Sequence, residues 1–126
     1  MGNIRLTRSD FYLKLYGGFP EILYGEIDKI EIQRDGPRII IGINVGNIPD
    51  NIPKNWGEFN RVHMDILLFD FSSINMSKFL RDGSSTIICK SNDLNQEIYI
   101  SGSCVLSVIF QIAIVNNIYG YKREIG

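Results

Sequence analysis

The sequence predicts a mostly β protein (α+β), an antiparallel β-sandwich or strongly curved sheet with a short N-terminal helix. Three observations predict this class. Short segments alternate apolar and polar residues at period two, and turn residues separate them about every 8–12 residues. Isoleucine, which favours strands, is unusually common. The chain contains no internal repeat, low-complexity tract or long linker, so we expect a single domain over residues 1–126.

The predicted helix covers residues 11–16. Ser9 or Asp10 can cap its start, and Gly17 and Gly18 would end it because glycine tolerates the left-handed conformation. Its apolar stripe would consist of Phe11, Leu15 and Tyr12.

The clearest strand pair is a hairpin formed by residues 26–34 and 38–45. A bulge near Asp28 would reconcile the imperfect alternation of the first strand. Asp35, Gly36 and Pro37 form the turn, and the second strand places its apolar residues on one face.

A long proline-containing loop is expected over residues 46–60, and residues 74–80 are ambiguous. The stretch 104–116 carries apolar residues on both of its faces, and its β-branched residues favour one strand over a helix. Residues 119–124 would be a final edge strand or a tail. Further strands are expected at residues 61–71, 84–90 and 97–101.

Composition excludes several classes of protein. There are 13 basic and 14 acidic residues, so the basic excess of a nucleic-acid-binding protein is missing. No apolar stretch approaches the ~20 residues of a spanning helix, and the N-terminus lacks the apolar core of a secretion signal. We therefore expect a cytoplasmic protein that binds neither nucleic acid directly nor membrane. Cys89 and Cys104 are expected to be free, packed thiols.

Catalytic chemistry is poorly represented. The single histidine, His63, lies on the polar side of a predicted strand, where a surface or hydrogen-bonded role is more typical than that of a general base. No spacing of Cys, His or carboxylates is typical of a metal site, and no phosphate-binding glycine loop occurs. We therefore expect no enzyme activity, no catalytic residue, no metal and no cofactor.

A set of local patterns extends over most of the chain: Phe19-Pro20, the acidic and apolar strand that ends in Arg34-Asp35-Gly36-Pro37, the strand 62–69, the stretch 98–113 and Tyr119-Gly120-Tyr121. Together these patterns resemble bacterial immunity proteins of polymorphic toxin systems, such as those of contact-dependent growth inhibition, and in particular the Immunity protein 50 family. The resemblance implies a cytosolic protein that binds a cognate toxin domain and blocks its active site. Many such toxins are nucleases with basic clefts, which an acidic surface would attract.

Two groups of residues are candidates for binding a partner. Trp56 beside Glu58 could be an aromatic anchor, although a ring that covers the edge of the core is the simpler interpretation. Glu26, Asp28 and Glu31 could form an acidic recognition patch, although charged residues on a solvated strand face are commoner.

Two alternatives remain at this stage. A small-molecule-binding β-barrel would enclose an apolar cavity larger than ~300 Å³, lined by the inward isoleucines. An enzyme would need His63 as its base. Exposed edge strands would also allow a homodimer.

Overall fold

The computed structural model describes residues 5–34, 36–46, 49, 52–80, 83–92 and 95–122. Within these ranges the chain forms one α-helix, α1 (Asp10–Tyr16), one 3-10 helix, η1 (Lys54–Trp56), and eight strands. The strands are β1 (Ile22–Gln33), β2 (Arg38–Val45), β3 (Arg61–Phe69), β4 (Ser73–Phe79), β5 (Ser85–Ser91), β6 (Gln96–Gly102), β7 (Cys104–Phe110) and β8 (Ile112–Tyr121).

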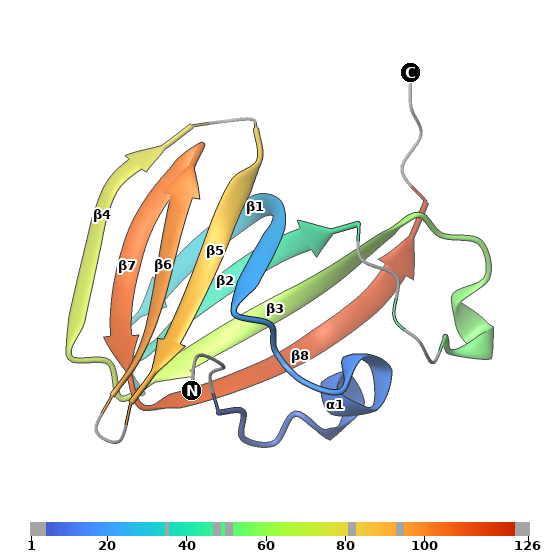
Figure 1. Cartoon of the computed structure of the whole chain (residues 1–126), viewed down its shortest axis with the longest axis horizontal. Helices are drawn as coiled ribbons and strands as arrows, with labels where there is room; N and C mark the ends of the chain where they lie inside the picture. The colour runs from blue at the N-terminus through green and yellow to red at the C-terminus, as the bar shows by residue number, and fades with distance from the viewer. Residues whose placement is uncertain are drawn as a thin grey trace.

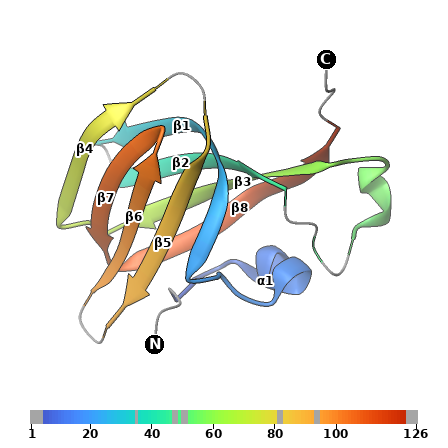
Figure 2. The same cartoon turned by 45° about the horizontal axis from the view of Figure 1, so that its top comes forward.

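The strands form one antiparallel sheet in the order β4-β7-β6-β5-β1-β2-β3-β8. The sheet bends so strongly that the half containing β4, β7, β6 and β5 lies over the half containing β2, β3 and β8 (Figures 1 and 2). The predicted mostly β class is confirmed. Of the two predicted forms, the structure is one open, bent sheet, and a sandwich of two separate sheets is not confirmed.

The bend arises because β1 belongs to both halves. Ile22–Gly25 pair with β5, whereas the residues from Glu26 to Gln33 pair with β2. The register shifts between Ile27 and Lys29, which confirms the bulge predicted near Asp28. An extra residue in one strand increases its twist and bends it, which suits a strand that turns a corner of the sheet.

A second corner lies where β3 leads into β4 and β7 leads into β8. Ser72 N–H donates to the Ile109 carbonyl at 2.9 Å, and Gln111 N–H donates to the Phe69 carbonyl at 3.3 Å. The two connections therefore cross between the halves side by side. Asp70 in this corner has a positive φ of 52°.

The prediction of one strand over residues 104–116 is wrong, because the chain changes strands at Gln111. Inward side chains occupy even positions up to Phe110, and odd positions at Ala113 and Val115. Because both faces of this stretch carry apolar residues, the period-two pattern does not reveal the change of strand. The expected edge strand at 119–124 is the end of β8 up to Tyr121, and residues 123–124 lie outside the described part.

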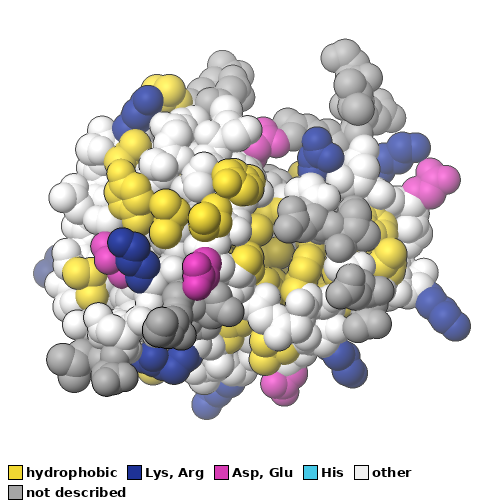
Figure 3. Space-filling model, in the orientation of Figure 1, with side chains coloured by type: hydrophobic (Ala, Val, Ile, Leu, Met, Phe, Trp, Pro, Cys, Tyr) yellow, Lys and Arg dark blue, Asp and Glu magenta, His cyan; other side chains and the backbone are white. Residues whose placement is uncertain are grey.

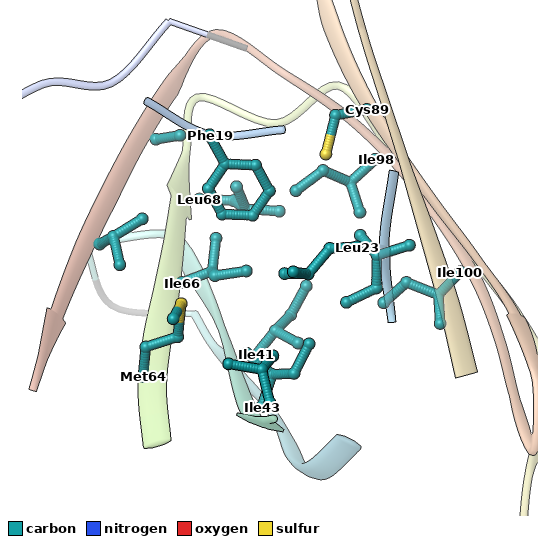
Figure 4. Packing of buried hydrophobic residues seen from close by; sticks show 14 of the residues in the cluster. Phe19, Leu23, Ile41, Ile43, Met64, Ile66, Leu68, Cys89, Ile98 and Ile100 are labelled. Carbon is teal, nitrogen blue, oxygen red and sulfur yellow. The ribbon is translucent and has the colours of Figure 1, made fainter. Parts of the chain in front are cut away.

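The core lies between the two halves of the sheet. Figure 4 shows Ile41, Met64 and Leu68 from one half directed toward Ile98 and Ile100 of the other. The inward isoleucines have no exposed surface, and a fully buried side chain of this size contributes about 1.5–3 kcal/mol of stability. The cavity that a ligand-binding barrel would need is filled by these side chains, and the sheet ends in the edge strands β4 and β8. Fully buried aliphatic residues in this core include Ile39, Ile41, Ile43, Ile66, Leu68, Ile87, Ile98 and Ile100.

Helix α1 lies beside β8 and ends as predicted at Gly17, which has a φ of 84° (Figure 1). Its buried side chains are Tyr12 and Leu15, whereas Phe11 is 47% exposed, so the prediction for Phe11 is wrong. Burial raises the pKa of the Tyr12 hydroxyl, which donates to the Gly18 carbonyl at 3.1 Å. No helix formed by the described residues has the length and apolar character needed to cross a membrane.

The N-terminal segment covers part of the free edge of β8. Thr7 N–H donates to the Ala113 carbonyl at 2.8 Å, and the Ser9 hydroxyl accepts from Val115 N–H at 2.9 Å. Ser9 precedes α1 but makes no side-chain cap with it, so the predicted role of Ser9 is corrected. The hydroxyl instead satisfies a backbone group at an edge that would otherwise be open to pairing.

The two cysteines are free and buried, as expected. Burial raises the pKa of the Cys89 thiol to about 12, and it also raises the pKa of Cys104. Both thiols therefore remain protonated at neutral pH and act as small apolar core groups.

The turn between β1 and β2 supplies a test of local strain. Gly36 has a φ of 64° with open space around its Cα, and Asp35 lies outside the described residues. Gly36→Val is expected to lower the free energy of unfolding by about 1–3 kcal/mol, because a β-branched residue is strained at positive φ. Urea unfolding measures the change. Gly18→Ala is the control, since Gly18 also has open space but no positive φ, and equal midpoints for both variants would contradict the prediction.

Candidate functional site

Polar side chains gather on the outward face of β1, β2, β3 and β8. The strand register aligns them in rows, because directly paired residues point to the same side of a sheet. One row is Glu26, Asn44, His63 and Tyr119. The next row is Lys29, Gly42, Asp65 and Asn116. Their neighbours along β3, Val62, Met64 and Ile66, point into the core.

His63 lies at the centre of this face. Its Nδ1 is 2.9 Å from Asn44 Oδ1 and 3.3 Å from Asp28 Oδ2, and its Nε2 is 2.9 Å from Asp65 Oδ1. Asn117 Nδ2 donates to the second oxygen of Asp65 at 3.0 Å. We call these five residues the His63 cluster. His63 is 5% exposed and Asp65 is 7% exposed, so these two side chains are bonded to the rest of the cluster away from water, whereas Asp28 and Asn117 lie at its exposed rim.

Tyr119 covers the His63 cluster from the side of β8. Its ring stacks on the imidazole of His63, with the centroids 5.0 Å apart and the planes inclined by 25°. Lys29 Nζ lies 3.9 Å from Asp65 Oδ2, which brings a positive charge to the buried carboxylate. The Lys29 side chain is 46% exposed, so this long ion pair is partly solvated and adds little to the stability of the cluster.

The His63 cluster is better suited to a structural role than to catalysis. A general base needs a ring nitrogen within reach of a substrate proton, and both nitrogens of His63 already face protein oxygens. Asp28 and Asp65 lie at opposite nitrogens of the ring and do not converge on one point. In the described part of the chain, no group of three His, Cys, Asp or Glu residues is placed to hold a metal ion.

The acidic residues predicted to bind a partner lie on the outward face of β1, but they are not equivalent. Asp28 contacts His63 and accepts from Asn44 Nδ2 at 3.2 Å, so it is part of the His63 cluster rather than a simple solvated charge. Glu31 is exposed and accepts from the neighbouring Gln33 side chain, and Glu26 is half-buried. Glu26 and Glu31 are therefore the two carboxylates that can meet a partner without disturbing the cluster.

Trp56 and Glu58 lie at the far end of β8. The Trp56 ring is half-buried and meets Phe59 edge to face, with the centroids 5.2 Å apart and an interplanar angle of 89°. A Cβ at Gly120 would lie 2.7 Å from Trp56 and 2.8 Å from Phe59, so both rings rest on this glycine. Glu58 forms an exposed ion pair with Lys122 at 3.3 Å. A hollow of about 350 Å³ lies beside this pair.

The structure does not bring the two predicted groups together on one face. Trp56 packs against Gly120. Tyr119, the residue before Gly120, projects from the opposite side of β8 and covers His63. Side chains alternate along a strand, so Trp56 and the carboxylates of β1 lie on opposite faces of the sheet.

The His63 cluster was not predicted from the sequence. The pattern placed His63 on the polar side of its strand, in a surface or hydrogen-bonded role, and did not indicate its partners. The available signal was a histidine and an aspartate two residues apart within a strand that is otherwise almost wholly apolar. Asp28, Asn44 and Asn117 come from three other segments, and their spacing along the chain gives no such signal.

Comparison with protein families gives a match to Immunity protein 50 over residues 12–121. The chain belongs to the Immunity protein 50 family. The matched region includes α1 from Tyr12 onward and all eight strands, so it contains both the His63 cluster and Trp56. Comparisons with curated proteins and with solved structures found no match. The family indicates an immunity protein and suggests a role that is not enzymatic.

Gly42 provides a test of the His63 cluster. Asp28 leans over this glycine, and a Cβ at Gly42 would collide with the Asp28 carboxylate and approach the Lys29 side chain to 3.0 Å. Gly42→Ala is therefore expected to displace Asp28 and to lower the free energy of unfolding by about 1–3 kcal/mol. Urea unfolding checks this value. Gly46→Ala is the control, because its Cβ would meet no atom closer than 4.0 Å, and a Gly42→Ala midpoint equal to the control would contradict the arrangement.

Proposed function

We propose that this immunity protein neutralises a cognate bacterial toxin domain by binding it in the cytoplasm and covering its active site. The observation that carries the proposal is the family match over residues 12–121. A buried histidine with both nitrogens occupied and a well-packed core suit a binding protein. Such a protein needs only a rigid surface of roughly 800 Å² to form a standard interface.

The outward face of β1, β2, β3 and β8 is the proposed toxin-binding face. The His63 cluster fixes the backbone there, so little conformational freedom is lost when a partner binds. Glu26 and Glu31 supply negative charge, and Asp28 shapes the surface between them. Tyr119 is 45% exposed yet stacked on His63, which makes it a pre-positioned aromatic contact.

A nuclease with a basic cleft is the partner that this charge distribution favours. Carboxylates on a rigid face attract a basic surface and raise the rate of encounter, particularly at low salt. Trp56 and Glu58 are proposed as a second contact region, which a toxin could reach only by extending around the edge strand β8.

The proposal is tested by expressing the toxin domain encoded beside this gene with and without the immunity protein. Relief of growth arrest, together with co-purification of the two proteins, is the expected result. Failure of the purified proteins to associate, or growth arrest that persists although the immunity protein is folded and abundant, would contradict the proposal.

Reversing the outward carboxylates tests the proposed face. The double variant Glu26→Lys/Glu31→Lys is expected to slow toxin association by roughly tenfold at low salt, and the difference should shrink as salt screens the charges. Stopped-flow association over a range of salt concentrations measures the effect. The control, Asp10→Lys/Glu21→Lys, makes the same change of charge at exposed positions away from this face. Equal slowing of both variants would show that only net charge matters.

Trp56→Ala tests the second contact region. If Trp56 anchors the toxin, the variant should weaken binding by about 2 kcal/mol or more, as measured by calorimetry on folded protein. Phe59→Ala is the matched control, because Phe59 rests on the same glycine and its loss removes similar packing. Equal losses of affinity in the two variants would mean that Trp56 acts through packing alone.

A further inference from the structure

The half of the sheet opposite the proposed toxin face carries an exposed patch of its own. It lies on the outward side of β1, β5 and β6, where Ile22 pairs with Ile88 and Ile88 pairs with Tyr99. Residues two positions further along these strands point the same way, whereas the residues between them point into the core. We call this surface the outer patch: Ile22, Tyr24, Ile88, Lys90, Glu97 and Tyr99.

The outer patch is unusually apolar for a solvated sheet face. Ile22 is 49% exposed, Tyr24 is 65% exposed and Tyr99 is 41% exposed. Figure 3 shows a band of hydrophobic side chains across the half of the sheet that lies in front in Figure 1. Contiguous apolar side chains on a rigid surface mark an interaction site more often than single exposed ones do.

The shape of the patch combines a projection with a hollow. Ile88, Lys90, Glu97 and Tyr99 line a hollow of about 300 Å³. Tyr24, the most exposed of the large apolar side chains, lies on β1, one strand away from β5 and roughly 10 Å across the sheet from β6. The hollow is lined by two registered pairs of β5 and β6, Ile88 with Tyr99 and Lys90 with Glu97.

The charges of the patch are self-complementary. Lys90 and Glu97 are directly paired in the register of β5 and β6, yet they form no ion pair with each other. Within the described residues, neither side chain has another hydrogen-bonding or ionic partner. The patch thus offers one positive and one negative group at the two sides of the hollow, and its net charge is zero.

We infer that a second copy of this chain docks on the outer patch about a two-fold axis. In a two-fold interface every contact between two different residues occurs twice, once in each direction between the copies. Each feature of the patch must therefore find its complement on the same patch. With the axis along the strands between β5 and β6, Lys90 of each copy meets Glu97 of the other, and Ile88 of each copy meets Tyr99 of the other. A strongly basic or acidic partner would gain no net electrostatic attraction from a patch whose net charge is zero. The dimer leaves the proposed toxin face of both copies open, so this inference does not rest on toxin binding.

Sedimentation equilibrium over a hundredfold range of protein concentration tests the dimer. The wild-type chain is expected to shift from monomer to dimer across the range, and Tyr99→Ala should weaken association by at least about tenfold, equivalent to 1.4 kcal/mol. Phe11→Ala is the control, because Phe11 is 47% exposed on α1 and lies away from the patch. A wild-type chain that stays monomeric throughout would overturn the proposal.

Charge reversal tests the two-fold arrangement directly. Lys90→Glu and Glu97→Lys should each lose dimerisation, because each places like charges opposite one another across the axis. An equimolar mixture of the two variants should dimerise again, since every contact then joins Lys to Glu. Restored dimerisation in the mixture requires contact between the two variants. A conformational change within one chain therefore does not explain it. Failure of the mixture to associate, or loss of toxin affinity from Tyr99→Ala in a chain that is always monomeric, would overturn the inference.

Discussion

Strand β1 holds the molecule together, because its first residues pair with β5 and its remaining residues pair with β2. A sheet whose central strand turns a corner must fold its two halves over each other, and the side chains between them become the core. At the second corner, near Asp70 and Gln111, two connections pass side by side from one half of the sheet to the other: β3 to β4 and β7 to β8. The fold therefore depends on backbone continuity at two corners, and the apolar residues fill the space that those corners define.

The His63 cluster follows from the same bend. The bulge at Asp28 sets the carboxylate above Gly42 and within reach of His63, while β3 and β8 supply Asp65 and Asn117. Buried polar groups cost free energy unless all of them are satisfied, and here each finds a partner. The outcome is an outward face whose strands are tied to one another by charge and hydrogen bonds as well as by their ladder. The outer patch on the other half has no such cluster.

Local features of this fold could be predicted from the sequence, and features assembled from distant segments could not. The hairpin of β1 and β2, the bulge near Asp28, the end of α1 at Gly17 and the inward residues of β3 all follow from turn chemistry or period-two patterns. The change of strand at Gln111 was missed because apolar residues occupy both faces there. The His63 cluster takes residues from β1, β2, β3 and β8. The spacing of residues within one strand does not show which strands pair with it, so the cluster could not be predicted.

The contact of Trp56 with Gly120 has a practical consequence. Trp56 is the single tryptophan of the chain, and its half-buried ring rests on Gly120 of β8. Indole fluorescence therefore reports on one defined end of the sheet and not on an average over the molecule. Events that alter the end of β8, such as fraying of the edge strand or the arrival of a ligand on either of its faces, are visible by emission spectroscopy without an attached dye.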